Sequence, residues 1–205
     1  MIRRIGIMGG TFDPIHYGHL VAAEAARVEY HLEKVIFVPT GNPPHKTERE
    51  IAGARHRYNM VRLACNTNPD FRVSRVEIDR QGFSYTSDTV AYFRAKYGQE
   101  SELFFITGAD AIKEILSWRR VADLMKECYF IAATRPGYQF NEDSQLPEEF
   151  AARVTNLDVP ALAISSSQIR AMVSEGKSIK YLLPETVEAY IKKHQLYRGR
   201  EHESS

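Results

Sequence analysis

Residues 9–20 constrain the fold more than any other stretch of the chain. They read GGTFDPIHYGHL and follow the short apolar run IGIM at residues 5–8. Further along the chain, apolar side chains recur at helical spacing at Leu20, Ala23, Ala26 and Tyr30. A helix is therefore predicted to begin near residue 17 or 18. A buried strand, a glycine turn and a helix N-terminus bring unpaired N–H groups and the positive end of a helix dipole together. The stretch therefore predicts a phosphate site.

Two histidines decide what kind of phosphate site this is. His16 and His19 are three residues apart, which places them on one side of the first helical turn, where both can face one anion. An imidazole donates a hydrogen bond to phosphate and can carry positive charge when the phosphate raises its pKa. The segment contains neither a Gly-Lys-Ser/Thr loop nor a G-x-G-x-x-G fingerprint. The plainer interpretation is a helix-capping turn with two surface histidines.

The segments that follow predict a parallel α/β sheet. Residues 34–39 (KVIFVP) form a second buried strand after a helix of crossover length, and such βαβ units bind ligands at the carboxyl ends of their strands. Loops 9–19 and 40–46 both lie at that edge. We predict a Rossmann-like sheet with helices on both faces. Its other strands are expected within 71–78 and at 103–107, 128–133, 154–159 and 161–164, and its other helices at 55–67, from about 86, and within 180–197.

Composition limits the alternatives. A chain of 205 residues that is 43% hydrophobic fits one large domain, which we place at residues 1–197 with a flexible polar tail at 198–205. Its 27 basic and 26 acidic residues are interspersed, so no nucleic-acid surface is expected. Neither a signal peptide nor a membrane-spanning run is present, which predicts a cytoplasmic protein. Cys65 and Cys128 are predicted to be reduced, packed thiols rather than zinc ligands.

Several polar residues follow predicted strands and each allows two interpretations. Lys46 ends a loop stiffened by two prolines, which could aim it at a phosphate, or it is an ordinary exposed lysine. Asp110, just past an apolar strand, could bind ribose hydroxyls or cap the next helix. Arg135, at another strand end, could bind an acidic substrate group or pair with a surface carboxylate.

Three other segments also allow two interpretations, as parts of a binding site or as residues with a purely structural role. Thr86 and Ser87 could be a simple helix N-cap. Trp118, the only tryptophan, is by itself more often a core residue than a platform for a ligand ring. Residues 164–170 (ISSSQIR) are typical of a serine-capped helix start carrying an exposed Arg170.

Taken together, these segments resemble a known family. GGTFDPIHYGH resembles the first signature of the nucleotidyltransferase superfamily, and ISSSQIR resembles its second, I-S-S-T-x-I-R, with Ser167 keeping the hydroxyl of the threonine. Residues 3–197 are similar to bacterial nicotinate-nucleotide adenylyltransferases, which also carry P-P-H-K, S-Y-T, G-x-D followed by tryptophan, and R-P-G-Y. Thr40 departs from the asparagine of many relatives. Two weak motifs in the right order, some 150 residues apart, make one specific signal.

The resemblance implies transfer of the adenylyl group of ATP to nicotinate mononucleotide, which gives deamido-NAD and pyrophosphate in NAD biosynthesis. It implies catalytic roles for His16, His19, Lys46 and Arg170. It implies contacts to nicotinate mononucleotide, with Trp118 stacked on the pyridine ring, by Lys46, Thr86, Trp118 and Arg135. It implies contacts to ATP by Gly9, Gly10, Thr11, Phe12, Gly18, Gly108, Asp110, Ile164, Ser165, Ser166 and Ser167.

The need to screen the triphosphate implies Mg²⁺, held mainly by phosphates and water because no carboxylate cluster marks a protein-built cage. Phosphopantetheine adenylyltransferases share both signatures but lack the S-Y-T and G-x-D to W segments, and cytidylyltransferases are more distant. A non-catalytic nucleotide sensor on the same fold is disfavoured by the intact His16, His19 and Arg170. The sequence is compatible with a homo-oligomer.

Overall fold

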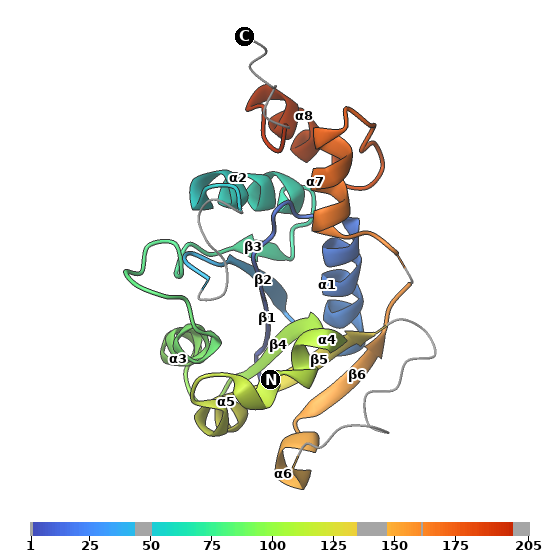
Figure 1. Ribbon diagram of the computed structural model, residues 1–205. Coiled ribbons are helices and arrows are strands. Elements are labelled where there is room, and N and C mark those ends of the chain that lie inside the picture. Colours follow the sequence, from blue (N-terminus) through green and yellow to red (C-terminus); the bar gives the residue numbers. More distant parts are fainter. Residues whose placement is uncertain (1, 44–50, 135–146, 161, 199–205) are drawn as a thin grey trace.

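The computed structural model describes residues 2–43, 51–134, 147–160 and 162–198. Its centre is a six-stranded sheet in the order β3-β2-β1-β4-β5-β6, in which every neighbouring pair is parallel (Figure 1). This is the order of doubly wound nucleotide-binding sheets and confirms the predicted fold class. The strands are β1 (Arg4–Gly10), β2 (Lys34–Pro39), β3 (Phe71–Val73), β4 (Glu102–Gly108), β5 (Tyr129–Thr134) and β6 (Val154–Asp158).

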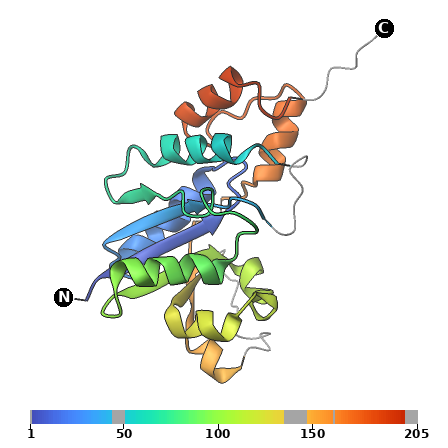
Figure 2. The same cartoon turned by 90° about the vertical axis from the view of Figure 1, so that its left-hand side faces the viewer.

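Helices cover both faces of the sheet. Helices α1 and α2 pack on one face, with α7 beside them and α8 on the outer side of α2, and α3, α4 and α5 pack on the other face, an arrangement that Figures 1 and 2 show from two directions. Their bounds are α1 (Tyr17–Glu29), α2 (Ala54–Cys65), α3 (Thr86–Tyr97), α4 (Ala109–Lys113), the 3₁₀ helix η1 (Ile115–Ser117), α5 (Val121–Glu127), α6 (Glu148–Ala151), α7 (Ser166–Ser174) and α8 (Glu185–Lys193).

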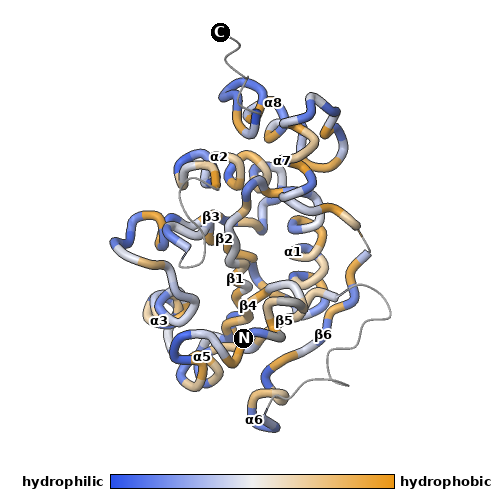
Figure 3. The backbone as a smooth tube through the Cα atoms, in the orientation of Figure 1, coloured by the Kyte–Doolittle hydropathy of each residue, from blue (hydrophilic) through white to orange (hydrophobic). Residues whose placement is uncertain are grey.

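Alternation along the strands produces the two layers of the core. In β1, Ile5 and Ile7 are wholly buried in the layer under α3 and α5, whereas Met8 faces the layer under α1 and α2. The same alternation in β4 sends Phe105 to the first layer and Ile106 to the second. Because both faces are covered, these strands are continuous apolar runs in the sequence. Along the backbone in Figure 3, hydrophobic residues mark the central strands and the sheet-facing turns of the helices.

The sheet has a topological switch point where β1 and β4 lie side by side. The chain leaves β1 through α1 toward β2, but leaves β4 toward β5 on the opposite side. Met8 pairs with Ile106, so the ends of these two strands, Gly10 and Gly108, open at the same edge of the sheet. Ligands of doubly wound sheets bind outside the carboxyl ends of strands at such a switch point.

Three predicted elements are shorter than expected or absent. Within 71–78 only Phe71–Val73 is a strand, because the chain then turns and sends Glu77 into the interior. Residues 162–164 form no strand, because the chain crosses from the edge strand β6 back to α7 there; residue 161 lies outside the described part. The last helix begins only after its N-cap Pro184, because the preceding turn docks on α1, with the Tyr17 N–H donating to the Leu182 carbonyl at 3.1 Å.

Both cysteines are buried free thiols, as predicted. Burial raises the pKa of Cys65 to about 12 and raises the pKa of Cys128 as well, so neither is a nucleophile near neutral pH. Of the helices in the described ranges, none combines the length and apolarity needed to cross a membrane.

Candidate active site

The N-terminus of α1 is built by its two histidines. His16 is the N-cap, with extended backbone (φ −146°, ψ 172°), and its N–H donates a hydrogen bond to Nδ1 of His19 at 3.2 Å. The predicted helix start near residue 17 is thereby confirmed. Because Nδ1 of His19 accepts this bond, the proton of its neutral ring lies on Nε2. His19 therefore presents an N–H donor on the edge of its ring away from the helix backbone.

The two imidazole rings lie against each other, with His16 buried and His19 partly exposed. Their centroids lie 3.8 Å apart with the ring planes tilted by 30°, and His16 is only 6% exposed. Desolvation lowers the pKa of His16 to about 4, and desolvation followed by repulsion from His16 lowers the pKa of His19 to about 3. The interpretation as a surface histidine is wrong for His16, and His19 is only partly exposed. Without a bound anion, both rings are neutral hydrogen-bonding groups at pH 7.

This histidine pair makes stability depend on pH. Both folded-state pKa values lie below the unfolded value of about 6.5, so their contribution is present above pH 6.5 and is lost as the pH falls toward 4 and 3. With two such groups, the free energy of unfolding is expected to fall by about 2 to 4 kcal/mol when the pH is lowered from 7 to 5. Urea unfolding at the two pH values measures this. A His16→Asn/His19→Asn variant with an equally steep decline would contradict the assignment.

The glycines of the first loop allow close packing beneath the site. A Cβ on Gly9 would stand 2.9 Å from the Phe105 ring, and one on Gly18 would stand 3.0 Å from the His16 ring. Phe12 has φ +49° and its buried ring meets His19 edge-on, with 5.1 Å between centroids. The loop thus has its side chains packed inward, and its backbone is what it can offer to a ligand.

The N-terminus of α7 joins the first loop directly. The hydroxyl of Ser166 donates to the Pro14 carbonyl at 2.9 Å, and Nη1 of Arg170 donates to the Asp13 carbonyl at 2.8 Å. Nη2 of Arg170 reaches the Ser167 hydroxyl at 3.4 Å. Segments more than 150 residues apart in sequence therefore meet at one place, and Arg170 is not merely an exposed side chain at a helix start.

The helix-cap interpretation of the serines is also correct in part. Ser165 is the N-cap of α7, and its hydroxyl accepts the Gln168 N–H at 3.1 Å. Ser165 and Ser167 are exposed. The Ile164 carbonyl lies 3.9 Å from where a Gly18 Cβ would stand. The start of α7 consequently lies next to the start of α1.

Trp118 packs on the side of the sheet formed by β4 and β5. Its ring meets Phe105 edge-on at 5.9 Å and Phe130 at 6.3 Å, and it is partly exposed. Its packing on the core is confirmed, and the exposed part of the ring remains available to a ligand. The Phe105 ring that supports Trp118 also lies under Gly9, so Trp118 and the first loop pack on the same side chain.

Thr86 is the first residue of α3, and its predicted alternative role as a cap is wrong. The N-cap is Tyr85, which makes no side-chain cap bond, and Ser87 is buried within the first turn. The guanidinium of Arg119 lies 4.6 Å from the centre of the Tyr85 ring. This contact brings the start of α3 to the segment that carries Trp118.

The remaining predicted residues lie around the same edge or beyond the described ranges. Gly108 is the exposed N-cap of α4 and Asp110 is the second residue of that helix, so Asp110 is not its cap. Thr40 donates its N–H to the Gly10 carbonyl at 2.9 Å. Lys46 and Arg135 lie outside the described residues.

A buried arginine behind the loop is not predicted by the sequence analysis. Arg57 is completely buried. Its guanidinium donates to three carbonyls, those of Thr11 at 2.8 Å, Ala52 at 2.9 Å and Gly41 at 3.1 Å. A signal for its burial exists, because positions 57, 60, 61 and 64 follow the spacing of the apolar face of α2.

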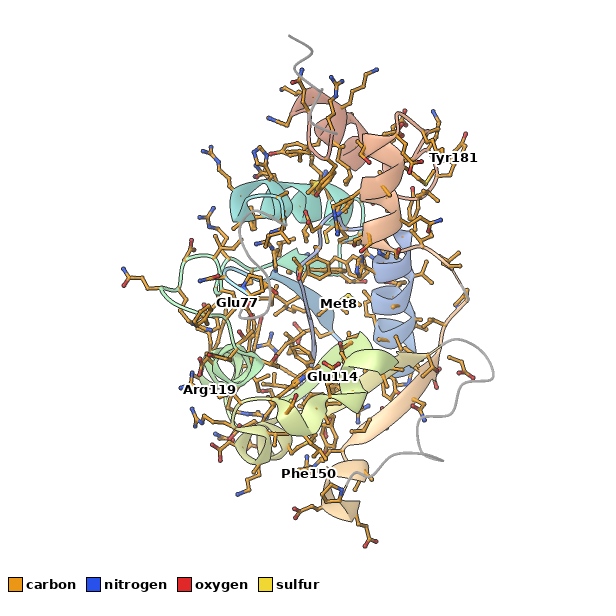
Figure 4. All side chains as sticks on the ribbon, in the orientation of Figure 1. Met8, Glu77, Glu114, Arg119, Phe150 and Tyr181 are labelled. Carbon is orange, nitrogen blue, oxygen red and sulfur yellow. The ribbon has the colours of Figure 1, made fainter. Side chains whose placement is uncertain are left out.

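Glu77, labelled in Figure 4, is a second residue that the sequence analysis does not predict. It is buried, and its backbone lies against Gly41. Its carboxylate accepts the Thr89 hydroxyl at 2.6 Å, and burial raises its pKa. Its backbone carbonyl would be 2.1 Å from a Cβ on Gly41. Only glycine fits at position 41, and Arg57 and Glu77 together fix that loop.

No group of three or more His, Cys, Asp or Glu that could hold a metal occurs among the residues described.

Comparisons with known proteins agree with this geometry. Residues 7–172 match the family model described as cytidylyltransferase-like. The chain is 63% identical to a probable nicotinate-nucleotide adenylyltransferase of Moorella thermoacetica, over 96% of this chain and 93% of the relative. It is 55% identical to one of Thermoanaerobacter sp., over 95% and 94%.

Solved structures give the same fold. Plasmodium falciparum nicotinic acid mononucleotide adenylyltransferase, in complexes with NaAD and with APC, superposes with TM-scores of 0.76 and 0.74 at 22% and 21% identity. Each alignment covers 95% of this chain and 97% of that chain. At such identity the likeness concerns the fold, whereas the family model and the close relatives decide membership. The chain therefore belongs to the cytidylyltransferase-like family and, within it, to the nicotinate-nucleotide adenylyltransferases.

Proposed function

We propose that this protein transfers the adenylyl group of ATP to nicotinate mononucleotide and releases deamido-NAD and pyrophosphate. The observation that carries the proposal is the meeting of α1 and α7, in which Arg170 and Ser166 bond to the carbonyls of residues 13 and 14. Two helix N-termini and a guanidinium then converge beside two imidazoles, an arrangement suited to a polyphosphate. The names of the close relatives supply the acceptor, and they do not favour phosphopantetheine.

The reaction is an in-line displacement. A phosphate oxygen of nicotinate mononucleotide attacks the α-phosphorus of ATP, a new P–O bond forms, and the bond to the bridging oxygen of the β-phosphate breaks. The acceptor phosphate is already anionic, so the reaction requires neither a covalent intermediate nor a strong base. Catalysis consists of alignment and of neutralising the charge that develops.

Each group has a distinct part in that alignment. The Nε2–H of His19 donates to the oxygens of the transferring phosphorus, and His16 packs against it and offers its own ring edge to the phosphates. Arg170 keeps donors free for the β- and γ-phosphates, since only Nη1 is used at short distance by the loop. The backbone of residues 9–12, Gly18 and residues 164–167 surrounds the nucleotide, with Gly108 and Asp110 beside its ribose.

The acceptor lies on the side of Trp118 and Thr86. We propose that the outward part of the Trp118 ring stacks on the pyridine and that Thr86 lies beside it, with Lys46 and Arg135 contributing phosphate or carboxylate contacts. Mg²⁺ enters as part of the substrate, held by phosphate oxygens and water. We place the reaction in the cytoplasm, where both nucleotides are available, with no role for nucleic acid.

The assay that tests this function compares three acceptors with ATP: nicotinate mononucleotide, nicotinamide mononucleotide and phosphopantetheine. We expect pyrophosphate release with nicotinate mononucleotide. We also expect kcat/KM to be higher for the acid than for the amide, by roughly ten- to a hundredfold for each backbone N–H that binds the carboxylate. The reason is that each buried donor left unpaired by the amide costs about 1–3 kcal/mol. Trp118→Ala should weaken both pyridine nucleotides and leave much of their ratio intact. A ratio near one would overturn the acid preference, and activity only with phosphopantetheine would overturn the function.

A further inference from the structure

The carboxylate of Asp13 is buried in the middle of the first loop and collects contacts from distant segments. The residue is 2% exposed. Oδ1 accepts hydrogen bonds from the Tyr197 hydroxyl at 2.6 Å and from the Ala52 N–H at 3.2 Å. Oδ2 accepts no hydrogen bond from any described residue and lies 3.7 Å from Nη1 of Arg170. A buried carboxylate held in this way needs its partners to remain in place.

Arg170 is held by this residue from two directions. Its Nη1 donates to the Asp13 backbone carbonyl and faces the Asp13 carboxylate as well. An arginine that neutralises phosphate charge must point its remaining donors in a fixed direction. Asp13 is therefore placed to orient Arg170, while its own side chain is buried.

Tyr197 brings the C-terminal segment to the same point. It lies 184 residues after Asp13 in sequence and follows α8 with φ +63°. Burial and the negative charge of Asp13 raise the pKa of Tyr197 far above its usual value, so its hydroxyl stays a donor at any working pH. The 51–53 segment enters the arrangement through Ala52, whose carbonyl accepts from Arg57.

We propose that Asp13 and Tyr197 are positioning residues: the Tyr197 hydroxyl holds the Asp13 carboxylate, which in turn fixes Arg170 and the histidine loop in the geometry that adenylyl transfer requires. The C-terminal segment is then part of the catalytic apparatus. The inference rests on the proposed function for its kinetic test, but its structural test needs no substrate.

The test removes the hydroxyl and keeps the ring. Tyr197→Phe is expected to lower kcat about tenfold while changing the KM of either substrate less than threefold, because misplacing a charge-neutralising group affects the transition state more than binding. In an Arg170→Lys background the same change is expected to lower kcat clearly less, by about threefold, because Arg170 is already lost and only the histidine loop remains to be misplaced.

Two tyrosines provide matched controls. Tyr190, on α8, bonds through its hydroxyl to His56 at 3.1 Å and Asn59 at 3.0 Å, so Tyr190→Phe removes a C-terminal hydrogen bond that does not reach the loop. Tyr181 is 81% exposed and projects from the outer surface (Figure 4). We expect Tyr190→Phe to reduce stability and leave kcat within twofold of the parent, and Tyr181→Phe to change neither.

The outcomes separate the two proposals. Equal losses of kcat from Tyr197→Phe in the parent and Arg170→Lys backgrounds, or a Tyr197→Phe enzyme with parental kcat, would refute the positioning role. A parent protein inactive with nicotinate mononucleotide would refute the proposed function instead. In that case NMR titration of His16 and His19 decides: Tyr197→Phe should move their low pKa values toward that of a free imidazole, Tyr190→Phe should not, and unchanged values would refute positioning.

Discussion

Replacing His19 by alanine is expected to lower kcat by roughly a hundredfold or more, with a much smaller change in ATP affinity. Its Nε2–H is fixed as a donor because Nδ1 accepts the His16 N–H at 3.2 Å, and a preorganised donor aimed at charge that develops in the transition state contributes about 10²–10³ in kcat. Burial lowers the pKa of His19 to about 3, so its ring is neutral at pH 7 and keeps the Nε2–H as its donor. Steady-state kinetics with ATP and nicotinate mononucleotide, together with nucleotide titration, measure both quantities.

A second variant separates chemistry from helix capping. In His19→Asn the amide oxygen can occupy the place of Nδ1 and still accept the His16 N–H, but nothing reaches the position of Nε2. We expect this variant to unfold close to the parent in urea and to be as slow as His19→Ala. If either variant retained kcat within about threefold of the parent, His19 would be a capping residue with no part in catalysis.

Arg170→Lys is expected to lower kcat/KM for ATP by about 10²–10³, although the charge is kept. Nη1 of Arg170 is engaged by the Asp13 carbonyl at 2.8 Å, and the fork lets the other nitrogens face the phosphates at the same time. A lysine is a single ammonium on a flexible stem and cannot serve both directions. Losing two charge-assisted hydrogen bonds at about 1.5–2 kcal/mol each, the low end of their usual strength, gives about 3–4 kcal/mol and hence that range.

The matched control is Arg62→Lys, the same change at an exposed position on α2, for which parental kinetics are expected. Arg170→Lys should also bind ATP more weakly by direct titration, because the positive charge can no longer be aimed. An Arg170→Lys enzyme with parental ATP affinity and turnover would show that the guanidinium only connects α7 to the loop.

Local patterns in the sequence determined the parts of this site that depend on neighbours along the chain. The strand, glycine turn and helix of residues 5–20 are readable because apolar runs and helical spacing are local properties. The serine cap of α7 is readable for the same reason, since its hydroxyl bonds three residues onward. The parallel sheet, and the edge at which its loops open, followed from the handedness of βαβ crossovers.

The tertiary structure alone decided the electrostatics. The pKa values of about 4 and 3 for His16 and His19 follow from desolvation, which depends on what other segments cover them, whereas the spacing of the two residues suggested only a shared face. The buried Arg57 resembles, in the sequence, one more charged residue of an amphipathic helix. Its role depends on three carbonyls from the loops at residues 11, 41 and 52.

Asp13 and Tyr197 show most clearly which contacts the sequence alone does not predict. Asp13 could be recognised as part of a motif, but its partners come from residues 52, 170 and 197. The identity of a buried charge's partners is fixed by packing between segments that are far apart in the chain, and no local periodicity records it. The sequence therefore determined where the proposed phosphate site lies and which helices meet there, and the fold determined which charges hold those helices together.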